Sequence, residues 1–178
     1  MAGSEQGLSD MVQHRELIGR MDAWLAVRRP DYHALLQPGV DDGALDAFEA
    51  KFSLKLPEAF RALYRWRNGQ PNSSFDSLQG NRMFSALEDI ADTKEMLDDM
   101  IGFDFEDPAT WRRGWVPFLS NGGGSYLCVD IDTQGGGQPG QLVGFWKADE
   151  DRPVEHASVE AWLAELVASM EAGTVEFD

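Results

Sequence analysis

The hydrophobic pattern of this chain changes its period twice, and these changes limit the folds that it can adopt. In several segments between residues 9 and 101 apolar residues recur every three or four positions, which is typical of amphipathic helices. Residues 115–147 read as extended segments, and residues 125–132 alternate with a period of two. Helical spacing returns after Ser158. Helices, then strands, then one more helix predict an α+β fold with a central, mainly antiparallel sheet flanked by helices.

The domain organisation follows from the same pattern. The 178 residues contain no internal repeat and no convincing linker, so they predict a single domain. Residues 1–8 are small and polar, and we expect them to be disordered. Residues 9–37 form a predicted helical arm whose first helix ends before Pro30. Residues 38–178 form the predicted α+β domain.

Short motifs predict how individual elements begin, end and face. A capping box at residues 85–88 should open an acidic helix, and Ser158 and Gly173 should cap the last helix at its two ends. Pro117 predicts that its strand lies at an edge of the sheet, because proline cannot donate to a ladder. The alternating segment should direct Leu127, Val129 and Ile131 to one face of the sheet, and Tyr126 and Cys128 to the other.

The charge of the chain restricts its partners. Fifteen lysines and arginines stand against 31 acidic residues, a formal net charge of −16. Direct binding to nucleic acid is disfavoured, because it depends on cations that neutralise phosphates, and an anionic membrane surface would repel the chain. A basic protein would be attracted over a long range. Solubility alone is an equally good reason for the same charge.

Location is predicted from absences in the sequence. The chain shows no secretory signal at its start and no run of about 18 apolar residues, so neither secretion nor a membrane span is expected. Cys128 is the only cysteine, which excludes an intramolecular disulfide and fits a reducing compartment. We therefore expect a cytoplasmic protein.

Candidate sites for ions are weak. The glycine-rich segment 121–125 lacks the Lys-Ser/Thr pair and the following helix of a phosphate loop, so it reads as a turn. Asp130 and Asp132 followed by Gly135 partly imitate a calcium loop, but the twelfth position is Gln141, where a bidentate glutamate is required. At most an adventitious cation is expected near Asp130 and Asp132.

Candidate catalytic groups are equally sparse. His14, His33 and His156 have no metal-ligand spacing, and Cys128 reads as a small buried hydrophobe. A pairing of Cys128 with His156 as nucleophile and base stays open, without support from the sequence. No catalytic residue, metal site or cofactor site is predicted.

The strongest feature is an acidic stretch. Residues 88–107 hold nine acidic residues and one basic residue, Lys94. Charge runs are usually solvated helix faces, but apolar residues inside a charged rim resemble the anatomy of an interface. As an alternative to the solvated face, we predict a docking surface for a basic partner, composed of Asp92, Glu95, Asp98, Asp99, Phe103, Asp104, Phe105, Glu106 and Asp107.

Three ordered blocks of the chain resemble the SUKH superfamily of bacterial immunity proteins, which also includes a fungal regulator of cell-wall synthesis. The first block runs from Pro38-Gly39-Val40 through Leu56-Pro57-Glu58 to Asn68-Gly69. The second contains Trp115-Val116-Pro117-Phe118 and residues 123–130, and the third contains residues 140–146 and 158–163. The resemblance covers about residues 38–173.

This resemblance implies an α+β fold with no catalysis and no cofactor. It implies direct binding of a protein toxin, in many cases a nuclease. The first hypothesis is therefore a non-enzymatic immunity protein that neutralises a basic toxin. A regulatory scaffold linked to cell-wall synthesis is the second. A small carboxylate-based hydrolase, for example with Asp130 and Asp132, is the third and requires both carboxylates in one cleft.

Overall fold

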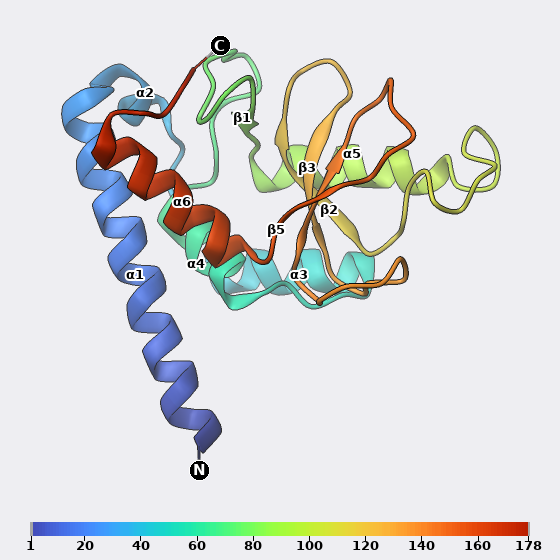
Figure 1. Ribbon diagram of the computed structural model, residues 1–178, viewed down its shortest axis with the longest axis horizontal. Coiled ribbons are helices and arrows are strands. Elements are labelled where there is room, and N and C mark those ends of the chain that lie inside the picture. Colours follow the sequence, from blue (N-terminus) through green and yellow to red (C-terminus); the bar gives the residue numbers. More distant parts are fainter. Residues whose placement is uncertain (1, 178) are drawn as a thin grey trace.

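The computed structural model describes residues 2–177, and in them six helices combine with one five-stranded sheet. Figure 1 shows α1 and α6 on the left, the sheet in the centre and the loop after α5 at the right-hand end. The elements are, in chain order, α1 (Ala2–Arg28), α2 (Pro30–Leu35), α3 (Asp42–Phe52), α4 (Glu58–Trp66), β1 (Met83–Phe84), α5 (Leu87–Asp99), β2 (Trp115–Ser120), β3 (Tyr126–Asp130), β4 (Leu142–Phe145), β5 (Val154–His156) and α6 (Val159–Ala172).

The sheet is an antiparallel meander in the order β1-β2-β3-β4-β5. This arrangement confirms the predicted α+β fold. The edge position predicted from Pro117 is wrong, since β2 pairs with β1 on one side and with β3 on the other. Proline is tolerated there because β1 pairs only with Leu119 and Ser120, and the β2–β3 register shifts between Pro117 and Leu119.

The two faces of the sheet carry two separate cores. Leu127 and Val129 belong to a large core that they share with residues of α1, α2, α3, α4 and α6. Cys128 belongs to a smaller core on the other face, together with Leu97 of α5 and Trp111. The predicted alternation in β3 is therefore confirmed, and α5 reaches the smaller core through its C-terminal half.

The N-terminal helix is longer than the sequence predicts. It begins at Ala2, so the segment that we expected to be disordered is helical from Ala2 onward, while Met1 lies outside the described residues. Leu17, Met21 and Leu25 are buried against the domain, so the C-terminal half of α1 is part of the large core. The N-terminal half extends beyond the rest of the molecule in Figure 1.

Helix α5 is capped by a residue distant in sequence, and the predicted capping box is wrong. The N-cap position is Ala86, whose side chain accepts no hydrogen bond. Asn68 replaces the missing cap, since its Oδ1 accepts from the backbone N–H of Leu87 at 2.8 Å and its Nδ2 donates to Glu88. The local caps of α6 are as predicted: the side chain of Ser158 accepts from Ala161, and Gly173 adopts a left-handed conformation.

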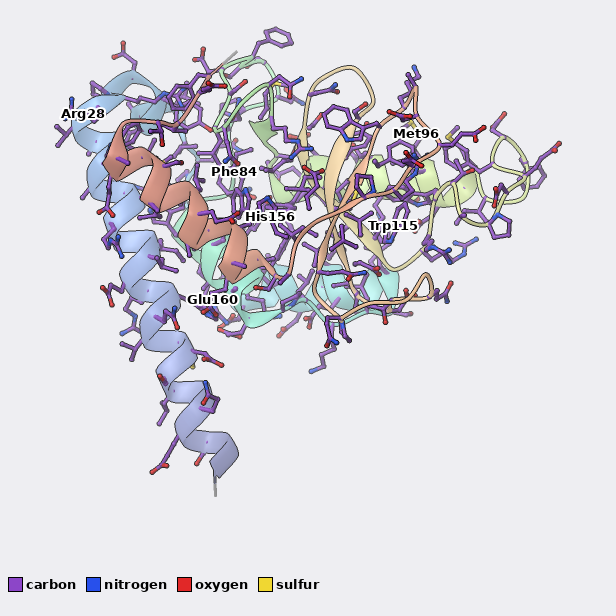
Figure 2. The ribbon with its side chains drawn as sticks, viewed as in Figure 1. Arg28, Phe84, Met96, Trp115, His156 and Glu160 are labelled. Carbon is purple, nitrogen blue, oxygen red and sulfur yellow. The ribbon has the colours of Figure 1, made fainter. Side chains whose placement is uncertain are left out.

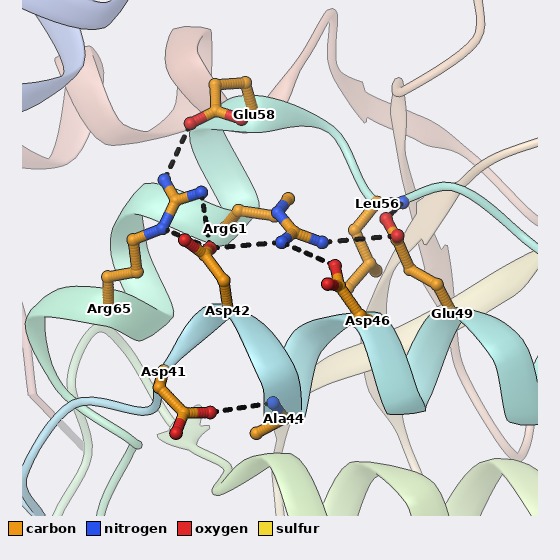
Figure 3. A network of polar contacts seen from close by, with 9 residues as sticks. All are labelled: Asp41, Asp42, Ala44, Asp46, Glu49, Leu56, Glu58, Arg61 and Arg65. Carbon is orange, nitrogen blue, oxygen red and sulfur yellow. Dashed lines mark hydrogen bonds and ion pairs between the residues drawn. The ribbon is translucent and has the colours of Figure 1, made fainter.

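A network of ion pairs joins α3 to α4 (Figure 3). Arg61 contacts Asp42, Asp46 and Glu49, and Arg65 bridges Asp42 and Glu58. The pairs of Arg65 are largely exposed and contribute little stability each, whereas the Arg61–Glu49 pair is mostly buried. The network matters for the charge distribution, because it neutralises carboxylates of α3 and α4 internally.

Candidate protein-binding surface

One face of α5 presents acidic side chains to solvent. Asp92, Glu95 and Asp99 are exposed and stand three or four positions apart, so they lie along one side of the helix. Met96 lies on the same helix with a relative exposure of 53%, and Figure 2 labels it. Glu95 pairs with Lys51 at 3.0 Å. We call Asp92, Glu95, Met96 and Asp99 the α5 face.

The loop that follows α5 extends this surface to the end of the molecule (Figure 1). Phe103 is 79% exposed, an unusual state for a phenylalanine, and Asp104, Glu106 and Asp107 are exposed around it. Phe105 is half-buried and packs edge-on against the ring of Phe145. Phe105 therefore holds the loop against the small core, whereas the side chain of Phe103 stays exposed.

Asp98 does not belong to this surface, contrary to the sequence prediction. It is buried, and its carboxylate accepts a 2.8 Å hydrogen bond from Nε1 of Trp111 and pairs with Lys94 at 3.2 Å. Lys94 is fully buried and also donates to the carbonyl of Arg113. Burial lowers the pKa of Lys94, and the nearby Asp98 carboxylate opposes this shift. The pair fixes α5 over the small core. The sequence signal for this buried pair was the position of Lys94 on the apolar side of α5.

A groove lies beside the N-terminal half of α5, with a volume of about 340 Å³. The loop after α4 contributes Asn72 and Phe75, α5 contributes Asp89 and Asp92, and β3 contributes Tyr126. Phe75 is 82% exposed. Burial raises the pKa of the Asp89 carboxyl, a hydrogen bond from Asn72 partly offsets this, and the neighbouring carboxylates of Glu88 and Asp92 raise it further.

The loop that carries Phe75 is held by Gln70. The buried side-chain amide of Gln70 donates to the carbonyls of Ser74 and Asp76, and its oxygen accepts from Tyr32 and from the backbone of Phe84. These bonds shape the loop against β1 and set the position of the groove wall. Sequence reasoning missed Phe75 and Asn72, because the polar loop showed no periodicity and nothing local placed it beside α5.

The other candidate catalytic and metal-binding residues do not come together in one site. Asp130 is buried and lines a different hollow from the exposed Asp132, so the two do not form a pair in one cleft. Cys128 is fully buried, as predicted, and burial raises the pKa of its thiol. His156 contacts Glu165 instead of Cys128. Within residues 2–177 no group of three or more potential metal ligands is present.

The glycine-rich segment 121–125 is the turn between β2 and β3, as predicted. The side-chain oxygen of Asn121 accepts from the backbone N–H groups of Gly123 and Ser125. The backbone N–H groups of Gly122, Gly123 and Ser125 are therefore engaged within the chain. In the part of the chain that the structure describes, no helix is long and apolar enough to cross a membrane.

These features define a single-domain α+β protein with an acidic surface on which Phe75 and Phe103 are exposed. Comparison with known families gives a match to the SMI1 / KNR4 family (SUKH-1) over residues 39–165. The chain belongs to this family, which confirms the resemblance read from its sequence. The family supports an immunity or regulatory protein, and its members are generally non-enzymatic.

A segment of 58 residues is 40% identical to part of the F-box protein SKIP16 of Arabidopsis thaliana. The segment represents 33% of this chain and 13% of that protein, so the chain spans only a small part of this relative.

Proposed function

We propose that this protein is a non-enzymatic, cytoplasmic immunity protein that binds and neutralises a basic bacterial toxin. The observation that carries the proposal is the concentration of unpaired carboxylates around apolar side chains on one end of the molecule. Asp92 and Asp99 make no ion pair within the described residues, whereas Asp42 and Asp46 are paired with arginines. On the α5 face, Asp92 and Asp99 thus retain their negative charge for a partner, while Glu95 pairs with Lys51.

In this mechanism charge acts on the encounter of the two proteins, and apolar contact stabilises the complex. The carboxylates attract a cationic surface over a long range and accelerate the encounter. Phe103 and Met96 then supply apolar area that is buried when the complex forms, inside a polar rim. A nuclease toxin carries a basic groove for its substrate, and an acidic protein lying in that groove blocks it without any chemistry of its own.

The family supports a second function, a regulatory scaffold linked to cell-wall synthesis. The two functions differ in their requirement for a toxin. A scaffold supports growth when no toxin is present, whereas an immunity protein changes survival only when its toxin is made.

The proposal predicts that the gene adjacent to this one encodes the toxin, and the test is co-expression of the two proteins. We expect wild-type protein to restore survival and the double variant Glu95→Lys/Asp99→Lys to lose this protection. Glu5→Lys/Glu16→Lys is the matched control, because these exposed residues of α1 undergo the same change of charge away from α5. In solution the association rate should fall as salt rises.

Two results would contradict the proposal. Cells that die equally with and without the protein exclude an immunity function for that toxin. If both double variants lose protection to the same extent, net charge alone acts, and the α5 face has no specific role.

A further inference from the structure

The groove beside α5 is built from aromatic walls and a carboxylate rim. Phe75 and Tyr126 provide rings, and Asp89 and Asp92 provide carboxylates from successive turns of the same helix face. No lysine or arginine lines the groove.

The carboxylates of the groove are only partly satisfied by the protein. Asp89 receives a single long hydrogen bond, from Nδ2 of Asn72 at 3.4 Å. Asp92 makes neither a hydrogen bond nor an ion pair within residues 2–177. Half-buried Asp89 is held near two further carboxylates, Glu88 and Asp92, so the ionised form of Asp89 is disfavoured in the free protein. A cation in the groove would relieve this repulsion.

We propose that this groove receives an arginine side chain presented by the basic protein partner. The inference rests on the proposed function, because it assigns a specific contact to the same acidic surface. The guanidinium would lie against the rings of Phe75 and Tyr126 and donate hydrogen bonds to Asp89 and Asp92.

The geometry selects arginine over lysine. Side chains three positions apart on a helix have Cβ atoms about 5–6 Å apart, a separation that the broad fork of a guanidinium can bridge with separate N–H donors. A guanidinium also stacks flat on an aromatic ring, while an ammonium is a compact, strongly hydrated point charge. An exposed phenylalanine next to two carboxylates is therefore matched by arginine in both shape and charge.

The experiment is a titration of the full chain, labelled with ¹⁵N, with capped Gly-Arg-Gly, Gly-Lys-Gly and Gly-citrulline-Gly tripeptides. Amide chemical shifts report where each peptide binds and how tightly. We expect the arginine peptide to perturb residues 72–75 and the start of α5, with an affinity about tenfold above that of the lysine peptide. The uncharged citrulline peptide should not bind.

Three variants locate the contact. Asp89→Asn and Asp92→Asn should each weaken the arginine peptide by about tenfold, because each removes a charged hydrogen-bond acceptor. Phe75→Leu should weaken it about two- to fivefold through loss of the ring. Asp99→Asn is the matched control on the same helix, outside the groove, and should leave the affinity unchanged. Circular dichroism checks that each variant is folded.

The inference fails if arginine and lysine peptides bind equally, if the shifts spread over the whole acidic surface, or if Asp89→Asn and Asp99→Asn have the same effect. Such a failure leaves the proposed function intact when Glu95→Lys/Asp99→Lys still abolishes protection from the toxin. Conversely, absence of protection by wild-type protein refutes the proposed function, whatever the tripeptides show.

Discussion

Replacing Lys94 with methionine should destabilise the protein by about 3–5 kcal/mol, the usual cost of removing one partner of a buried ion pair. Methionine fills much of the same volume, so the cost comes from polar groups and not from a cavity. Asp98 would keep its buried charge with only the indole N–H of Trp111 as a partner, and the carbonyl of Arg113 would lose its donor.

The double variant Lys94→Met/Asp98→Asn separates charge from packing. Asparagine retains an acceptor for the indole N–H of Trp111 but carries no charge. We therefore expect the double variant to be at least about 2 kcal/mol more stable than the sum of the two single effects predicts. Asp98→Asn alone should cost less than Lys94→Met, because Lys94 keeps the carbonyl of Arg113 as a hydrogen-bond acceptor.

Urea denaturation followed by tryptophan fluorescence measures all four proteins in one cycle, and Lys94→Met should also lower the Tm by roughly 10 °C. A loss below about 1 kcal/mol in Lys94→Met would refute the reasoning, since an isolated carboxylate would then be tolerated in the small core. Strict additivity in the cycle would refute it equally, because it would mean that Lys94 and Asp98 do not interact.

Other parts of the structure give independent predictions. Asn68→Ala removes the acceptor for the Leu87 N–H and should cost about 1–2 kcal/mol, measured as a shift in the urea midpoint; an unchanged midpoint would mean that solvent replaces the cap. Burial raises the pKa of Cys128 above its ordinary value of 9.0, so above pH 9.0 the folded state retains a proton that the unfolded chain loses. The free energy of unfolding should therefore fall above pH 9.0 by up to about 1.4 kcal/mol per pH unit. The variant Cys128→Ala should flatten this fall. The ring of Phe177 lies against Arg29, and the carbonyl of the preceding residue, Glu176, accepts a hydrogen bond from the Gly80 N–H. Phe177→Ala should therefore speed hydrogen exchange at the Gly80 N–H. Unchanged exchange would show that the ring does not hold the C-terminal segment.

Local signals in the sequence predict local structure well in this protein. The alternation in residues 125–132 correctly divides Leu127 and Cys128 between two cores, because the period of a strand fixes the face of each side chain. Ser158 and Gly173 cap α6 as predicted, because both caps act within a few residues of the helix. Strand β5 was missed, since it is only three residues long and mostly exposed.

Interactions between distant residues could not be predicted in this way. The acceptor that caps α5 comes from Asn68, 19 residues before Leu87, and no local motif announces it. Phe75 reaches the groove only because Gln70 folds its loop against β1, a consequence of tertiary packing. Asp98 was assigned to the surface by counting acidic residues, although the apolar position of Lys94, four residues earlier, indicated a buried pair.

Helix α5 has one side that maintains its place and another that contributes little to it, since the contact of Glu95 with Lys51 is an exposed ion pair. Lys94, Leu97 and Asp98 face inward, whereas Asp92 and Asp99 touch solvent. Substitutions on the outward side can therefore accumulate with little effect on folding, so the recognition specificity of such a scaffold is free to diverge. A randomised library confined to the outward positions of α5 and to Phe103 should yield folded variants that recognise new targets.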